Sequence, residues 1–140
     1  MAKSGPIILI EDDEDDRDTM RIVLNQLEIK NELLIFDSPS AAISYLSTTS
    51  DRPFIILCDI NMPEQTGLQF KKDIDANPQL RRKSIPFVFY STATDAQAIT
   101  EAYLEITVQG FFRKGDAMQD IKNTMKAILD YWMLCYHPNT

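Results

Sequence analysis

The sequence contains few of the residues that build zinc sites and covalent crosslinks. It has one histidine, His137, and two cysteines, Cys58 and Cys135, among 140 residues. Zinc sites take grouped Cys and His ligands, and a disulfide framework needs several paired cysteines, so we expect neither. So few cysteines suit a reducing compartment, and we expect a cytoplasmic protein. We assign no role to His137, which lies close to the end of the chain.

Long hydrophobic runs are absent as well. No apolar stretch approaches the roughly 20 residues that are needed to cross a bilayer. The first six residues lead directly into a short apolar run and then into acids, which is not the pattern of a signal peptide. We therefore expect no membrane segment and no membrane partner.

Basic residues are outnumbered because of one segment. The chain has 14 Lys and Arg against 21 Asp and Glu, a formal net charge of −7, and six of the acids form the unbroken run 11–16. Leaving that run out gives 15 acids against 14 bases, so the rest of the chain is nearly neutral. This distribution argues against an acidic disordered protein, in which the charge is spread, and against a basic nucleic-acid-binding surface.

The length and composition fit one folded domain. A chain of 140 residues with 44% hydrophobic and 25% charged residues can bury a substantial core. We expect a single domain over residues 1–140, with a core at about 7–134 and a short tail at 135–140. No internal repeat or low-complexity linker divides it.

Five short apolar segments are typical of β-strands. They are continuous runs of β-branched, aliphatic and aromatic residues, a pattern that suits central parallel strands covered on both faces. The five segments are Ile7–Ile10, Leu33–Phe36, Ile55–Cys58, Phe87–Tyr90 and Gly110–Phe112.

Segments with helical spacing follow each of these strands. Ser38 before Pro39 is typical of an N-cap and a first helical residue. Segments 66–69, 94–97 and 116–119 each place a capping side chain three residues before a Gln, close to the capping-box spacing. The alternation predicts an α/β fold: a single doubly wound, flavodoxin-like domain with a five-stranded parallel sheet and five helices on its two faces.

Polar residues that follow the strands are the candidates for chemistry, because ligands bind at the carboxyl ends of an open parallel sheet. They are one ammonium, one hydroxyl and three carboxylates, from Lys114, Ser91, Asp59, Glu11 and Asp12. Carboxylates gathered at one edge repel and raise each other's pKa values, and a divalent cation such as Mg²⁺ (or Mn²⁺) would remove that repulsion. With a lysine and a hydroxyl to hold further oxygens, and one carboxylate to attack, the set points to phosphoryl transfer.

Four motifs in chain order resemble the receiver domain of two-component response regulators, in its stand-alone, chemotaxis-regulator-like form. The motifs are Ile-Leu-Ile-Glu-Asp-Asp at 8–13, Cys-Asp-Ile-Asn-Met-Pro at 58–63 with Gly67 after it, Ser-Thr at 91–92, and Gly-Phe-Phe-Arg-Lys at 110–114. Each motif alone is weak, but the four together span the chain from about Ile7 to Trp132.

The resemblance implies a role for each residue. Asp59 resembles the phosphoacceptor, which takes a phosphoryl group from a phosphohistidine of a sensor histidine kinase or a phosphotransfer protein. Lys114 matches the lysine that pairs with the acceptor or its phosphate. Ser91 matches the switch hydroxyl, and Phe111 stands at the position of the switch aromatic. The implied conformational change is a population shift that draws Ser91 in and turns Phe111 inward.

The implied metal ligands are Glu11, Asp12, Asp59 and the backbone carbonyl of Asn61, with Asp12 as the direct acidic ligand. Sliding the motif by one residue would bring Asp13 into the acidic pair in place of Glu11. We prefer Glu11 and Asp12, because the strand is expected to end just before them. The remaining acids of the run, residues 14–16, are interpreted as a solvated helix N-terminus favoured by the helix dipole.

One residue departs from the family's pattern in a way that matters. The family usually has Pro directly after the lysine, joined by a cis peptide, whereas Gly115 follows Lys114 here. A cis bond to a non-proline residue costs about 2.5–4 kcal/mol, so the sequence leaves open whether this bond is cis or trans. A trans bond could shift the lysine or loosen the loop before the last helix.

The resemblance also implies how the signal leaves the domain. Nothing follows the last helix, so we expect a downstream protein partner, a phosphorelay step or a homodimer, using the fourth predicted helix, the fifth strand and the fifth helix. The end of the chain, with Tyr131, Trp132 and Tyr136, resembles stand-alone receivers that partner bacterial phytochrome-like kinases.

Two other functions compete with this one. Phosphatases of the haloacid dehalogenase type also use an Asp nucleophile and Mg²⁺, but they carry a second Asp two residues later, where this chain has Asn61, and their nucleophile follows the first strand. A phosphorylation-independent interaction module is the other alternative, and Gly115 is the reason to keep it. We expect a signalling domain and not an enzyme.

Overall fold

The computed structural model describes residues 2–62, 64–92, 96–104, 106 and 108–138. Five parallel strands form one sheet in the order β2-β1-β3-β4-β5, and the first strand therefore lies inside it. The strands are β1 (Ile7–Ile10), β2 (Leu33–Phe36), β3 (Ile55–Cys58), β4 (Phe87–Ser91) and β5 (Gly110–Arg113). The predicted parallel sheet is confirmed.

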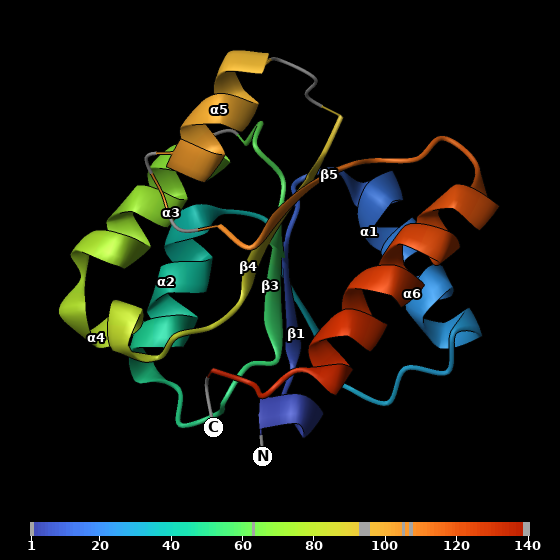
Figure 1. Cartoon of the computed structure of the whole chain (residues 1–140), viewed down its shortest axis with the longest axis horizontal. Helices are drawn as coiled ribbons and strands as arrows, with labels where there is room; N and C mark the ends of the chain where they lie inside the picture. The colour runs from blue at the N-terminus through green and yellow to red at the C-terminus, as the bar shows by residue number, and fades with distance from the viewer. Residues whose placement is uncertain (1, 63, 93–95, 105, 107, 139–140) are drawn as a thin grey trace.

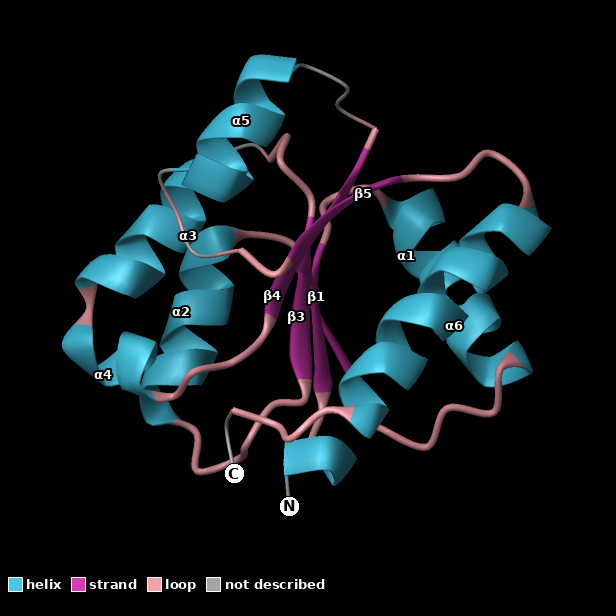
Figure 2. Cartoon of the chain, in the orientation of Figure 1, coloured by secondary structure: helices cyan, strands magenta, loops and turns pink. Residues whose placement is uncertain are grey.

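Helices cover both faces of this sheet (Figures 1 and 2). A short 3₁₀ turn, η1 (Ala2–Ser4), precedes β1. The face on one side carries α1 (Glu14–Gln26) and α6 (Met118–Leu134). The other face carries α2 (Pro39–Thr48), α3 (Gly67–Ala76), α4 (Pro78–Arg82) and α5 (Ala96–Leu104).

The central strands are apolar throughout because they are covered on both faces. Every residue of β1 and β3 is buried, and alternate side chains enter different cores. Ile8 and Ile56 pack among the helices α2 to α5, whereas Ile7 and Leu57 pack against α1 and α6. Because these strands are buried on both faces, each of their residues is apolar, and the resulting continuous apolar runs identify them as strands in the sequence.

Two of the predicted helix starts are confirmed and one is wrong. The Ser38 hydroxyl accepts the Ala41 N–H at 3.3 Å, and the Thr66 hydroxyl accepts the Gln69 N–H at 3.1 Å. The start signal at 116–119 does not cap α6, whose N-cap is Ala117 without a side-chain hydrogen bond. Thr94 and Asp95 of the remaining signal lie outside the described residues.

The expectation of five helices is one too low, because the described residues contain a sixth, α4. It is five residues long, too short to show a hydrophobic period. Its cause is local: the Asn77 side chain accepts the N–H groups of Gln79 (3.0 Å) and Leu80 (3.3 Å), and Pro78 supplies the first helical residue.

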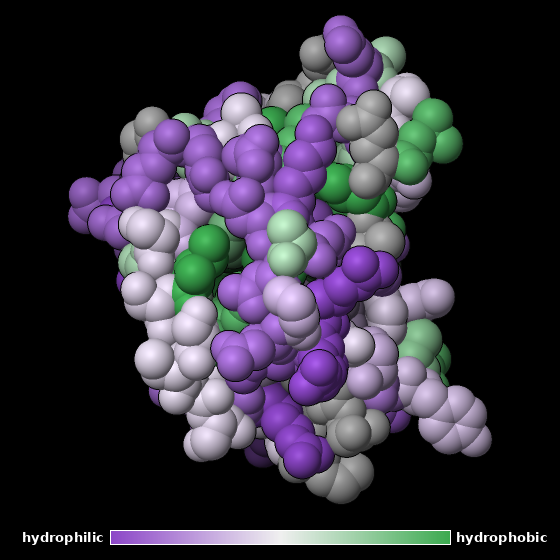
Figure 3. Space-filling model, turned by 90° about the vertical axis from the view of Figure 1, so that its left-hand side faces the viewer, coloured by the Kyte–Doolittle hydropathy of each residue, from purple (hydrophilic) through white to green (hydrophobic). Residues whose placement is uncertain are grey.

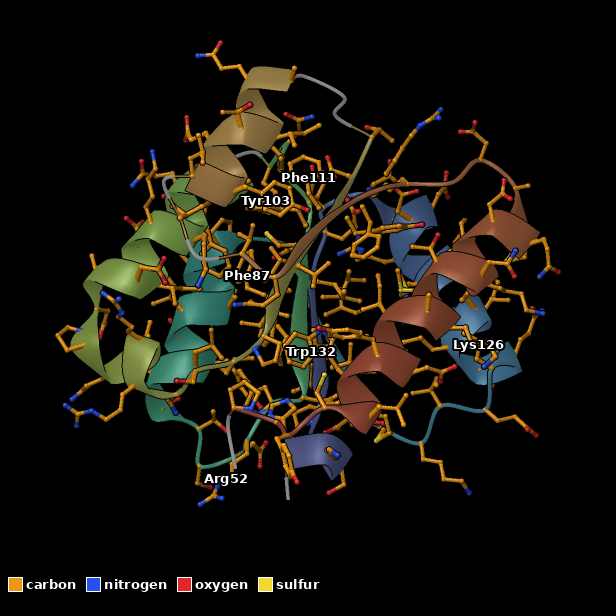
Figure 4. All side chains as sticks on the ribbon, viewed as in Figure 1. Arg52, Phe87, Tyr103, Phe111, Lys126 and Trp132 are labelled. Atoms are coloured by element: carbon orange, nitrogen blue, oxygen red, sulfur yellow. The ribbon has the colours of Figure 1, made fainter. Side chains whose placement is uncertain are left out.

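The chain after α6 packs back onto the amino end of the sheet. His137 is buried, its Nε2 lies 2.6 Å from the Phe54 carbonyl oxygen, and its ring stacks on Phe54 with centroids 5.5 Å apart. The Trp132 ring, labelled in Figure 4, packs edge-on against the His137 ring, with the two ring centroids 6.2 Å apart. The histidine to which we assigned no role therefore has a structural one.

The outer surface differs from side to side. The side formed by α2, α3 and α4 is mostly hydrophilic, with small hydrophobic areas (Figure 3). Exposed large hydrophobic side chains lie elsewhere, mainly on α5, α6 and the segment after α6: Tyr103, Leu104, Met118, Tyr131, Met133, Leu134 and Tyr136. Among the described residues, no helix combines the length and the apolar character needed to span a membrane.

Candidate functional site

The register of the sheet brings the predicted residues to its carboxyl edge. Ile10 of β1 pairs with Cys58 of β3, so the residues that follow, Glu11 and Asp59, leave the sheet side by side. On the other side of β3, Ser91 ends β4, and its carbonyl accepts the Lys114 N–H at 2.9 Å. The parallel topology alone therefore gathers groups that are up to 103 residues apart.

Asp59 is buried and each of its carboxylate oxygens is engaged. Oδ1 accepts the Ser91 hydroxyl at 2.6 Å, the Ile60 N–H at 2.7 Å and the Asn61 N–H at 3.3 Å. Oδ2 faces the Lys114 ammonium at 3.1 Å. The side chain keeps 11% of its exposure, so it is held rigidly while still reachable from the edge.

Lys114 is surrounded by three carboxylates. Its Nζ contacts Glu11 Oε1, lies 2.8 Å from Asp16 Oδ2 and 3.1 Å from Asp59 Oδ2, and only 9% of the side chain is exposed. Burial alone would lower the pKa of this lysine, but its hydrogen bonds to Asp16 and Glu11 raise it above its usual value. The ammonium is therefore charged at every physiological pH.

Glu11 is a buried carboxylate whose ionised form is disfavoured by its surroundings. Burial raises its pKa from 4.5 to about 7, and the neighbouring charge of Asp59 adds to the rise, while Lys114 opposes both. The carboxylate also accepts the Asp13 N–H at 3.3 Å, which fixes its second oxygen. A proton or a second cation would relieve the same excess of negative charge.

One oxygen each from Glu11, Asp12 and Asp59 lies within 4.8 Å of the others, which is a group that could hold a metal ion. Asp13 takes a different position, as the N-cap of α1, where its side chain accepts the Asp16 N–H at 3.1 Å. The geometry thus groups Glu11 and Asp12, the pair that we preferred, and leaves Asp13 to the helix. Pro63 of the 58–63 motif lies outside the described residues.

Gly67 permits the close approach of α3 to the site. A Cβ at this position would lie 2.4 Å from the Asp59 carbonyl oxygen and 2.9 Å from the Phe89 ring. Its N–H donates to the Ile60 carbonyl at 2.7 Å, which tightens the segment after β3. A side chain here would push α3 away from the backbone that positions Asp59.

Phe111 is half-buried on the face of the sheet that α5 covers, where Figure 4 labels it. Its ring packs against Phe89 at 5.6 Å and an interplanar angle of 49°. Ser91 already points at Asp59 in this conformation. Of the two predicted switch residues, Ser91 therefore contacts Asp59 directly, whereas Phe111 packs on Phe89 in the core.

Two features of the lysine loop were open or missed at the sequence level. The Lys114–Gly115 peptide is trans, and the lysine reaches Asp59 all the same. Asp16, which we interpreted as part of a solvated helix start, instead binds Lys114. No local signal distinguishes Asp16 from Asp15, because its contact depends on a residue 98 positions away.

Comparison with known proteins finds relatives along most of the chain. The family model described as "Response regulator receiver domain" matches residues 7–126. Response regulator Rcp1 from Synechocystis sp. is 30% identical over 132 residues, which cover 91% of this chain and 88% of Rcp1.

Two solved structures share the fold over nearly their whole length. The phosphorylated cyanobacterial phytochrome response regulator RcpA is 25% identical with a TM-score of 0.81, covering 94% of each chain. The Mn²⁺-bound form of Rcp1 is 29% identical with a TM-score of 0.79, covering 94% of this chain and 95% of that one.

Proposed function

The chain belongs to the response regulator receiver domain family, and we propose that it accepts a phosphoryl group on Asp59 and passes the signal to a partner protein. One observation carries this proposal: a buried Asp59 carboxylate with Ser91 on one oxygen and Lys114 on the other. That pairing offers one hydrogen-bond donor and one cation to the oxygens of an incoming group.

In the proposed reaction, a carboxylate oxygen of Asp59 attacks the phosphorus of a phosphohistidine on a sensor kinase or phosphotransfer protein. A P–O bond forms, the P–N bond breaks, and the leaving imidazole nitrogen keeps the electron pair. Lys114 neutralises charge on the transferred oxygens, and the Ser91 hydroxyl donates a hydrogen bond to one of them. The signal is the population shift that follows from these new contacts of Ser91, with Phe111 moving in its half-buried position.

Divalent cation binding fits the donor set. The oxygens of Glu11, Asp12 and Asp59 are hard ligands within 4.8 Å of one another, and the Asn61 carbonyl is the proposed fourth ligand. Rcp1 has been solved in a Mn²⁺-bound form, which supports divalent cation binding by this chain. Bound Mg²⁺ or Mn²⁺ would supply positive charge against the acidic cluster and the phosphoryl oxygens.

The proposed partner surface consists of α5, β5 and α6, the elements expected from the sequence. Tyr103 is 52% exposed, Leu104 79% and Tyr131 61%, so this side offers apolar contact area that α2, α3 and α4 do not. It would receive a downstream protein or a second copy of the chain. RcpA is a phytochrome response regulator, which supports a phytochrome-like sensor kinase as the phosphoryl source. We place this exchange in the cytoplasm, in keeping with two free cysteines.

The test is phosphorylation by a small donor. Wild-type protein incubated with acetyl phosphate and MgCl₂ should gain one phosphoryl group by intact mass, and Asp59→Asn should abolish the gain. Asp18→Asn, a matched change at an exposed site on α1, should be labelled like the wild type. A wild-type protein that stays unlabelled while a control receiver is labelled would support the phosphorylation-independent module instead. Family membership gives no support to the haloacid dehalogenase alternative.

A further inference from the structure

The Lys114 ammonium and the proposed metal site share two carboxylate side chains. Two of the lysine's three carboxylate partners, Glu11 and Asp59, also belong to the candidate metal group. The third partner, Asp16, lies on α1 outside that group. A divalent cation bound to this group would compete with the lysine for the negative charge of Glu11 and Asp59 and would repel its ammonium.

The ammonium cannot simply move into water. Its side chain is 9% exposed, and the N–H donors that leave Glu11 and Asp59 would need a new acceptor. Asp16 Oδ2, at 2.8 Å, already accepts from the ammonium, and that carboxylate lies at the edge of the site with 45% of its side chain exposed.

A small cavity next to the lysine provides a second acceptor. The cavity has a volume of about 30 Å³, room for about one water-sized group, and its wall includes Asp16, Thr19, Tyr90 and Lys114. The Tyr90 hydroxyl is buried beside the Gly115 backbone and makes no hydrogen bond of good geometry within the described part of the chain. A buried hydroxyl gains from a hydrogen-bond partner, and a polar group that enters this cavity would supply one.

We propose that Asp16 and Tyr90 form a second binding position for the Lys114 ammonium, which the lysine occupies when a divalent cation binds Glu11, Asp12 and Asp59. The inference rests on the metal site of the proposed function. In this position the ammonium donates to the Asp16 carboxylate and to the Tyr90 hydroxyl, and it stays beside Asp59 without competing for the metal ligands. Asp16 and Tyr90 are positioning residues that act through the lysine.

The first test is a titration with MgCl₂ alone, without a phosphodonor and at constant ionic strength, followed by NMR of the ¹⁵N-labelled protein. Asp16→Asn should weaken Mg²⁺ binding on the order of tenfold relative to Asp15→Asn, the same charge change on the neighbouring exposed residue. Tyr90→Phe should weaken it by about threefold relative to Tyr131→Phe, a matched change at an exposed ring. Asp16→Glu should restore most of the loss.

The second test follows the lysine directly, because a long-range charge effect would not move its ammonium. Adding Mg²⁺ to the wild type should shift the Lys114 ¹⁵Nζ resonance while keeping its protection from solvent exchange. In Asp16→Asn and Tyr90→Phe that protection should fall in the Mg²⁺-bound form. Equal Mg²⁺ affinities for Asp16→Asn and Asp15→Asn, or unchanged Lys114 protection in both variants, would overturn the proposal.

The outcome can be separated from that of the proposed function. Acetyl phosphate labelling of the same preparations reports on Asp59, whereas the Mg²⁺ titration reports on the lysine. A wild type that binds Mg²⁺ with the expected dependence on Asp16 but is not labelled would uphold the second position and overturn the phosphoacceptor assignment. A wild type that is labelled but whose Mg²⁺ binding does not depend on Asp16 would uphold the phosphoacceptor assignment and overturn the second position.

Discussion

Two lysines are buried in the described part of the chain, and their surroundings differ. Lys71 on α3 is 6% exposed, pairs with Asp75 four residues later at 2.8 Å, and lies 5.2 Å from the centre of the Phe87 ring. Lys114 is 9% exposed and is held by three carboxylates from β1, α1 and β3. Both are charged groups removed from water, yet only one lies at the site.

The two lysines differ in how far along the chain the carboxylates lie that neutralise their charge. Lys71 finds its counter-charge one helical turn away, so α3 carries its own neutralisation wherever it packs. Lys114 finds its partners 55, 98 and 103 residues away, so its neutralisation exists only when the sheet is assembled. A ligand that binds the partners of Lys114 can therefore rearrange its ion pairs, whereas the Lys71–Asp75 pair lies away from the proposed site.

Replacing each buried lysine in turn should give the largest difference in the free energy of unfolding. Lys114→Met leaves Glu11, Asp16 and Asp59 facing one another without a cation and should lower the free energy of unfolding by about 3 kcal/mol. Lys71→Met leaves Asp75, which is 20% exposed, near water and should cost about 1 kcal/mol or less. Denaturant unfolding at neutral pH measures both, and equal losses would remove the distinction.

The pH dependence of stability should single out the Lys114 region. The pKa of Glu11 is about 7 in the folded protein against 4.5 as the reference for the unfolded chain, so the folded state binds the proton more tightly in this window. The free energy of unfolding from this group therefore falls as pH rises, by about 2 kcal/mol between about pH 5 and pH 7.

Comparison with Glu11→Gln isolates this contribution. The unfolding free energy of the wild type minus that of Glu11→Gln should decrease as pH rises from about 5 to 7. Lys71→Met retains Glu11, so its unfolding free energy should show the same decrease as that of the wild type. Saturating Mg²⁺ should shrink the fall, because a divalent cation favours the ionised carboxylate. A difference that does not change between about pH 5 and pH 7 would contradict the raised pKa.

The loop that carries Lys114 should be easier to disturb than the helix that carries Lys71. In Gly115→Ala the new Cβ would lie 2.7 Å from Asp120 Cβ, so the loop must shift. We expect a loss of about 1 kcal/mol in stability together with a shift of the Lys114 ¹⁵Nζ resonance. An unchanged lysine resonance would show that the loop absorbs the methyl group without moving the site.

A partly exposed lysine should show the smallest loss of stability in this comparison. Lys72, next to Lys71, pairs with Glu101 across α3 and α5 at 3.0 Å, with 39% and 29% of the two side chains exposed. Lys72→Ala should change stability by about 0.5 kcal/mol or less, and Glu101→Gln should behave alike. A larger loss in both, measured by the same unfolding experiment, would mean that this pair anchors α5.

The sequence predicted the strands and most of the site because both depend on short-range patterns. Continuous apolar runs such as Ile55–Cys58 identify strands buried on both faces, and a parallel sheet then gathers whatever follows them. This reasoning predicted that Asp59, Ser91 and Lys114 lie together, and the structure places them in contact, with Glu11 grouped beside Asp12 and Asp59.

The rest depended on tertiary contacts that no local pattern records. Asp16 looked like any acid of a helix start, and only the fold brings it to Lys114. The role of His137 likewise appears only where the chain returns to Phe54. The helix α4 differs from these, because its start signal is local: Asn77 and Pro78 form the same kind of N-cap and first helical residue as Ser38 and Pro39.

The return of the chain to Phe54 has a practical consequence. Both the η1 turn and the segment around His137 lie at the amino end of the sheet, and the acceptor edge is at the opposite end (Figure 1). A dye or an immobilisation handle placed on η1 or beside His137 would therefore lie at the opposite end of the sheet from Asp59. Binding of a kinase to the acceptor edge could be recorded on a sensor surface with the protein oriented uniformly and that edge left open.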